Sequence, residues 1–112
     1  MEIREELVGD VVVVAPVGRV DSTTSSALDA RLTALDAAGR RRVVVDFGAV
    51  EYISSAGLRV MLSLAKRARD TGGRVALCAL DQSVRQVFDL AGFTALFTIL
   101  PERGQAVAAA SG

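Results

Sequence analysis

Histidine and tryptophan are absent from this chain, and cysteine occurs once. Without histidine there can be no Ser-His-Asp or Cys-His catalytic group and no imidazole ligand for zinc. The one cysteine, Cys78, cannot form an internal disulfide, and its place in the apolar run 75–80 predicts a small buried residue in a reducing compartment. These absences weigh against a hydrolase and against a zinc protein.

The chain also lacks an excess of charge and any long apolar run. Thirteen basic residues balance thirteen acidic ones, so nothing favours nucleic acid or an anionic membrane as a partner. The densest basic run, Arg40 to Arg42, is interpreted as a solvated connection. No apolar stretch reaches the roughly 18 residues of a membrane span, and we recognise no signal peptide, so we expect a soluble cytoplasmic protein.

The 112 residues suit one domain, which we place at residues 1–112. Hydrophobic residues make up 51% of the chain and aromatic residues 4%, so the expected core consists of Val, Leu, Ile and Ala side chains. The β-rich runs Ile3–Val8 and Val11–Val17 flank Gly9 and Asp10, which predicts a hairpin.

Further along the chain, apolar strand patterns alternate with helical spacing. Strands are predicted at 43–47, 74–80 and 96–100. Helices are predicted to begin near 21–24, at 55 and near 101, and a further helix is marked by apolar residues from Val84 to Ala91 and ended by Gly92. The predicted order is β-β-α-β-α-β-α-β-α. This is an α/β fold with about four helices and a mainly parallel sheet of four to five strands, with the N-terminal hairpin supplying an edge strand.

Residues 49–60 form the most informative stretch, because Ser54 and Ser55 stand where an extended segment should turn into an amphipathic helix. The unpaired N–H groups and the positive dipole end of a helix N-terminus would stabilise a phosphate added there. The stretch therefore suggests a switch that operates by serine phosphorylation. From the residues alone, the alternative is that one of the serines only caps the helix.

Three polar segments are expected to meet at the carboxyl ends of the strands: Gly18–Asp21, Asp46–Gly48 and Ser54–Ser55. Asp21 and Asp46 invite a paired-carboxylate site for a metal or for acid–base chemistry, but two carboxylates without a third ligand make a poor magnesium site. In the simpler alternative, Asp21 caps the first helix and Asp46 accepts hydrogen bonds from a turn.

No phosphate-binding loop and no G-x-S-x-G nucleophile motif occurs in the chain. The protein is therefore not expected to be a kinase or an NTPase, and phosphorylation would need another protein. We expect no catalytic residue, no metal and no cofactor.

Three stretches, taken together, resemble a known family: residues 18–24, residues 43–62 with Tyr-Ile-Ser-Ser-Ala-Gly-Leu at their centre, and residues 81–92. The chain resembles the STAS domain of bacterial anti-sigma factor antagonists over about residues 3–108. The resemblance implies a partner-switching cycle that regulates transcription, as in bacterial stress responses. The unphosphorylated antagonist binds an anti-sigma factor that is also a serine kinase, is released when that kinase phosphorylates it, and is reset by a serine phosphatase.

By position, the resemblance makes Ser55 the phosphoacceptor, places Gly57 and Leu58 in the motif behind it, and sets Asp21 at a nearby acidic position. It implies a partner-binding surface made of Asp21, Ser22, Thr23, Ser54, Ser55, Ala56, Gly57, Leu58 and Arg59.

The motif departs from its relatives at two positions. Ser54 stands where many relatives have Asp, which leaves it as a rival acceptor, and Ala56 stands where Ser or Thr is frequent. Two other functions stay open: a STAS scaffold or transport-system subunit without a phosphorylation cycle, and a small enzyme or nucleotide binder at the polar end. The sequence leaves a homodimer open as well.

Overall fold

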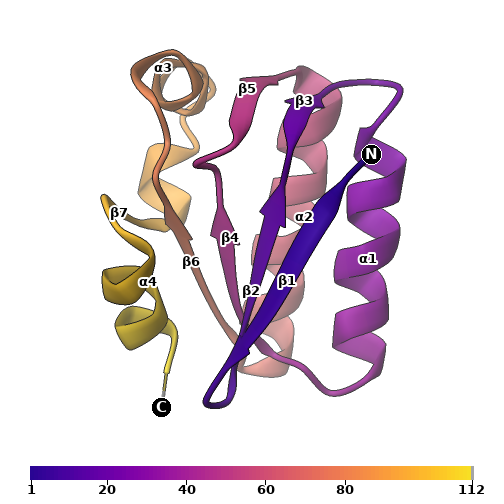
Figure 1. Ribbon diagram of the computed structural model, residues 1–112, viewed down its shortest axis with the longest axis vertical. Coiled ribbons are helices and arrows are strands. Elements are labelled where there is room, and N and C mark those ends of the chain that lie inside the picture. The colour runs from indigo at the N-terminus through magenta and orange to yellow at the C-terminus, as the bar shows by residue number, and fades with distance from the viewer. Residues whose placement is uncertain (112) are drawn as a thin grey trace.

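A five-stranded sheet forms the middle of the protein, of which the computed structural model describes residues 1–111 (Figure 1). Its strand order is β1-β2-β4-β6-β7. The strands are β1 (Ile3–Val8), β2 (Val11–Pro16), β4 (Arg42–Asp46), β6 (Arg74–Cys78) and β7 (Thr98–Leu100). β1 runs antiparallel to β2, and the other neighbours are parallel. The predicted α/β class and the N-terminal hairpin edge are confirmed.

Helices cover both faces of this sheet, as the alternation of apolar residues in β2 shows. The helices are α1 (Ser25–Ala37), α2 (Ser55–Thr71), α3 (Gln82–Leu90) and α4 (Arg103–Ala110), with a 3-10 turn η1 (Thr94–Leu96). Val12 and Val14 belong to the apolar cluster formed with α1 and α2, whereas Val11 and Val13 pack in a second cluster with Ala106 of α4. Because both faces are covered, β2 is apolar at consecutive positions.

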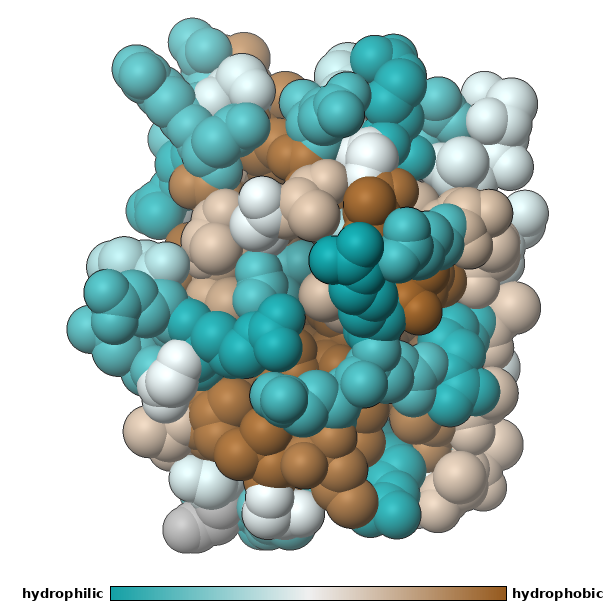
Figure 2. Space-filling view, in the orientation of Figure 1, coloured by the Kyte–Doolittle hydropathy of each residue, from teal (hydrophilic) through white to brown (hydrophobic). Residues whose placement is uncertain are grey.

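The face of the sheet that carries α4 is covered less completely than the face beneath α1 and α2. Figure 2 shows polar side chains over most of it and hydrophobic atoms near the β1–β2 turn and α4. Val8, at the end of β1, is exposed; it lies on the same side of the strand as Glu6, which pairs with Arg103 of α4. Among helices within residues 1–111, none has the length and apolar character needed to cross a bilayer.

Two short strands were not predicted. β3 (Gly18–Val20) pairs in parallel with β5 (Val50–Ile53) and forms a separate two-stranded sheet at one end of the main sheet. β3 has three residues and β5 has four, too few for a periodic pattern to stand out. Each is stabilised by a partner about 30 residues away in the chain, a contact that no local pattern reports.

Two other predicted boundaries are corrected by backbone geometry. The strand predicted at 74–80 ends at Cys78, because Ala79 turns the chain with φ 60°. The strand predicted at 96–100 begins only at Thr98, because η1 occupies residues 94–96.

Replacing Ala79 by glycine should stabilise the protein. The left-handed backbone region costs an L-residue roughly 1–2 kcal/mol, and glycine loses part of that gain through its greater freedom in the unfolded chain. We expect Ala79→Gly to raise the free energy of unfolding by about 0.5–1 kcal/mol in urea denaturation. Ala76→Gly, inside the strand β6 that Ala79 follows, should lower it; equal effects at the two positions would contradict the assignment of strain to Ala79.

Candidate functional site

The β3–β5 pair brings two helix starts to the same end of the molecule. β3 continues through the turn 21–24 into α1, and β5 continues through Ser54 into α2. The Ser54 backbone N–H donates to the Val20 carbonyl oxygen at 2.8 Å, so the start of α2 is fixed against the end of β3. The segments 18–21 and 54–55, which the sequence predicted to meet, are neighbours.

Ser54 is the residue that caps α2. Its backbone is extended, with φ −93° and ψ 175°, and its Oγ accepts a hydrogen bond from the Gly57 backbone N–H at 3.3 Å. Its carbonyl oxygen accepts from the Leu58 N–H at 2.9 Å. The half-buried Ser54 hydroxyl is therefore engaged in holding the helix start, which is the structural role considered for this pair of serines.

Ser55 is the first residue of α2 and is exposed. Within residues 1–111, its side chain makes no hydrogen bond. It stands where the first backbone N–H groups of the helix lack partners in the preceding turn and where the helix dipole is positive. No acidic residue lies in the first turn of α2 to offset that potential.

Gly57 allows the close docking of α2 onto the β3–β5 pair. A Cβ atom at this position would lie 2.7 Å from Ile53 Cγ1 and 2.9 Å from Val20 Cγ1. Both of those neighbours are buried, at 1% and 0% exposure, and have little room to shift. The glycine of the motif is explained by this contact.

Gly57→Ala should destabilise the protein by about 1–3 kcal/mol, because the added methyl group overpacks a buried contact. Gly104→Ala in α4 is the matched control, since nothing lies within 4 Å of its Cβ position and alanine favours a helix. Thermal unfolding of the two variants tests this. Equal melting temperatures would contradict the packing role of Gly57.

Asp21 organises the turn that leads into α1. Its Oδ1 accepts from the Thr23 hydroxyl at 2.7 Å and from the Thr23 backbone N–H at 3.0 Å. The Thr24 hydroxyl lies 3.3 Å from the same oxygen, and Arg19 Nε lies 3.5 Å from Oδ2. The Thr23 hydroxyl, its N–H and then Thr24 hold the pKa of Asp21 below its ordinary value of 3.8.

A lowered pKa gives the Asp21 carboxylate a stabilising effect that is fully present above about pH 4 and is lost as the pH falls through the lowered folded value. In an NMR titration of the side-chain carboxyl carbon, the Asp21 midpoint should lie below 3.8. Thr23→Ala removes the strongest donor and should move the midpoint up toward 3.8. An unchanged midpoint in Thr23→Ala would contradict the assigned cause.

Arg19 and Tyr52 form a platform beside these turns. They are opposite each other in the β3–β5 register, and the guanidinium carbon of Arg19 lies 4.3 Å from the centre of the Tyr52 ring. Both side chains are exposed. The sequence analysis included neither residue in the expected surface, and the cross-strand register that joins them could not be read from either segment alone.

The residues of the expected partner surface divide by burial. Ser22, Thr23, Ser55 and Arg59 are exposed, Asp21, Ser54 and Ala56 are half-buried, and Gly57 and Leu58 are buried. The last two thus lie beneath the surface and support it, because their positions on α2 face the core.

Asp46 accepts a hydrogen bond from a turn, as the simpler of its two interpretations predicted. Its Oδ1 accepts from the Gly48 backbone N–H at 2.8 Å, and its Oδ2 binds Arg103 Nε at 2.7 Å, so its contacts lie with α4 and not with the serines. Within residues 1–111, no group of three candidate ligands could hold a metal ion. Cys78 is buried as predicted, and burial, followed by the charge of Asp46, raises the pKa of its thiol to about 11.

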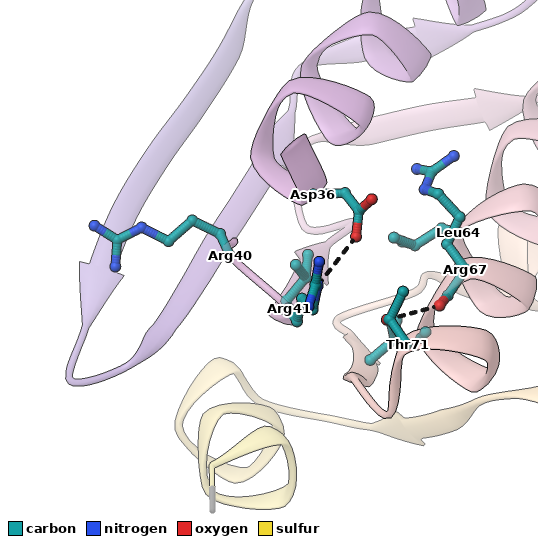
Figure 3. A pocket seen from close by; sticks show the side chains of 9 residues that line it. Asp36, Arg40, Arg41, Leu64, Arg67 and Thr71 are labelled. Atoms are coloured by element: carbon teal, nitrogen blue, oxygen red, sulfur yellow. Dashed lines mark hydrogen bonds and ion pairs between the residues drawn. The ribbon is translucent and has the colours of Figure 1, made fainter. Parts of the chain in front are cut away.

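The arginine run 40–42 lies near the ends of α1 and α2. A cavity of about 20 Å³ lies here, and its lining includes residues of this run and Arg67 of α2. A space of this volume holds about one water molecule. In Figure 3, Arg41 and Asp36 face each other, with Arg41 Nε 3.7 Å from Asp36 Oδ1, whereas the Arg40 side chain extends away from them. Arg40 and Arg41 form an exposed connection as predicted, but Arg42 does not: it is the half-buried first residue of β4, with its Nε 3.4 Å from Asp10 Oδ2.

Residues 2–106 match the family model described as the STAS domain. The chain belongs to the STAS domain family. It is 39% identical over 109 residues to BtrV of Bordetella bronchiseptica, which is named as an anti-sigma factor antagonist; the match covers 97% of this chain and 94% of BtrV. The recognition made from the sequence motifs is confirmed.

Solved structures share this STAS fold. An anti-sigma factor antagonist from Mycobacterium paratuberculosis superposes with a TM-score of 0.88 at 26% identity, covering 97% of this chain and 92% of that one. SpoIIAA of Bacillus in its phosphorylated form gives a TM-score of 0.75 at 18% identity, covering 96% of this chain and 97% of that one.

Proposed function

We propose that this protein is an anti-sigma factor antagonist controlled by phosphorylation of Ser55. In its unphosphorylated form it binds an anti-sigma factor with serine kinase activity, which frees a sigma factor for transcription. The kinase then modifies Ser55 and the complex separates, and a serine phosphatase restores the binding form. The protein acts in the cytoplasm as a binding module and carries out no catalysis itself.

One observation carries the proposal: Ser55 is exposed at the first position of α2, while the hydroxyl of its neighbour Ser54 is engaged in the cap. A kinase can reach the Ser55 hydroxyl without disturbing the fold, whereas modification of the Ser54 hydroxyl would remove the helix cap. This favours Ser55 over its rival. The family and the name of BtrV supply the class of partner.

A phosphate on Ser55 would act by local charge and bulk. It adds a charge of about −1.5 to −2 and three acceptor oxygens, which the start of α2 can accommodate within this protein. In an interface, the same group must lose its water and meets any acidic group on the partner. A penalty of roughly 3–4 kcal/mol weakens binding by two to three orders of magnitude.

Phosphorylation should therefore be confined to Ser55. We expect that incubation with ATP and serine kinases encoded in the same genome, followed by peptide mass spectrometry, finds the phosphate on Ser55 in the wild type and in Ser54→Ala. Ser55→Ala should accept none. Ser54→Ala should also lose about 1 kcal/mol of stability, because it removes the cap. Phosphate on Ser54 in the wild type would contradict the assignment.

Binding to the same kinase provides the second test of the proposed function. Isothermal titration should give similar affinities for the wild type and Ser55→Ala, and an affinity at least tenfold weaker for Ser55→Glu, which introduces charge at the helix start. Thr33→Glu is the matched control, with the same change of charge on an exposed hydroxyl residue of α1 that lies outside the expected partner surface. Undiminished binding by Ser55→Glu would contradict the switch.

A further inference from the structure

A groove runs along the outer side of α2, beginning about two turns beyond Ser55. It encloses about 320 Å³ and is lined by Leu62, Ala65, Lys66 and Arg69 of α2 and by Leu96 of η1. The four α2 residues have the spacing i, i+3, i+4 and i+7, which places them along one side of the helix. Three of the lining residues are apolar, and the other two, Lys66 and Arg69, are cationic.

Leu96 is exposed although its surroundings are firmly packed. It is 52% exposed, while Phe93 and Phe97 on either side of η1 pack against the main core. The Phe97 ring makes an edge contact with Phe88, with 6.0 Å between centroids, and the Leu96 N–H donates to the Phe93 carbonyl oxygen at 2.9 Å. The leucine is therefore held in place beside α2 and is not part of a loose loop.

The charge of α2 selects the chemistry of an occupant. This helix contains four basic residues (Arg59, Lys66, Arg67 and Arg69) and one acidic residue, Asp70. Within residues 1–111, neither Lys66 nor Arg69 forms an ion pair. A groove lined by apolar residues and two unpaired cations is complementary to a helix that has apolar residues on one side and acidic residues at its margin.

The groove continues the same side of α2 on which Ser55 stands. At about 100° per residue, Ser55, Arg59, Leu62, Lys66 and Arg69 fall within about 40° of one line along the helix. At about 1.5 Å per residue, this line is about 21 Å long. A standard interface covers about 800 Å² of each partner, or a disc about 30 Å across. One partner can therefore cover both the serine and the groove.

We propose that the groove between α2 and η1 is a second docking site for the anti-sigma factor, occupied by an acidic amphipathic helix of that partner. This inference rests on the proposed function for the identity of the partner. It divides the interface into two parts. The end at Ser55 is sensitive to phosphate, whereas the groove contributes affinity that phosphate does not reach directly.

Lys66→Glu tests the groove with the kinase that modifies Ser55 as the probe. We expect this variant to bind the kinase roughly tenfold more weakly than the wild type does. The affinity of the wild type should also depend more steeply on salt concentration than that of the variant. Leu96→Ser should weaken binding by a similar factor. Arg40→Glu is the matched control, with the same change in net charge on an exposed residue outside the groove, and should bind as the wild type does.

The outcomes separate the groove from the proposed function. If the wild type binds the kinase and both groove variants bind equally well, the groove inference is wrong and the switch at Ser55 stands. If no anti-sigma factor binds the wild type, both are wrong. A wild-type dimer that Lys66→Glu or Leu96→Ser dissociates in analytical ultracentrifugation would assign the groove to a second copy of this chain and overturn the proposal.

The position of the two parts gives one further expectation. Because Ser55 and Lys66 are far apart on the helix, the effects of Ser55→Glu and Lys66→Glu on binding free energy should add. Circular dichroism should show unchanged folding for all variants, since the substituted residues are exposed. A double variant no weaker than Ser55→Glu alone would contradict the division of the interface.

Discussion

The docking of the first turn of α2 onto the β3–β5 pair is the contact on which the rest of the site depends. Gly57 lets the helix approach Val20 and Ile53, and the Ser54 N–H bonds to the Val20 carbonyl oxygen at 2.8 Å. Ser54 then caps the helix, and Ser55 is left exposed at its first position. A larger residue in place of the glycine would displace the helix start and the serine together.

Much of the fold could be predicted because its main strands and helices have strong local patterns. β2 and β4 are continuous valine-rich runs, and Ser54 precedes a clear helical period. The β3–β5 pair could not be predicted, because strands this short are stabilised by each other and not by their own residues. The hydrogen-bond partner of Asp46 could not be predicted for a similar reason, because Arg103 lies 57 residues away in the chain.

The sequence identified the segments of the candidate site but not which of their residues are exposed. The motif identified Ser54 to Leu58 as one unit, yet the structure separates an exposed serine from a capping serine and from residues that support both. The helical period already contains that information, since residues 54, 57, 58 and 61 face the core and 55, 59 and 62 do not. The same period joins Ser55 to the groove at Leu62 and Leu96, which no motif contains.

A local electrostatic switch needs a rigid scaffold, and this helix start provides one. The account is tested most directly by preparing the protein phosphorylated at Ser55 and measuring its affinity for the kinase beside that of the unmodified protein, with backbone amide NMR spectra of both. We predict a dissociation constant two to three orders of magnitude larger, with shift changes confined to the first turns of α1 and α2. Equal affinities, or weaker binding accompanied by loss of the α2 helix, would contradict the account.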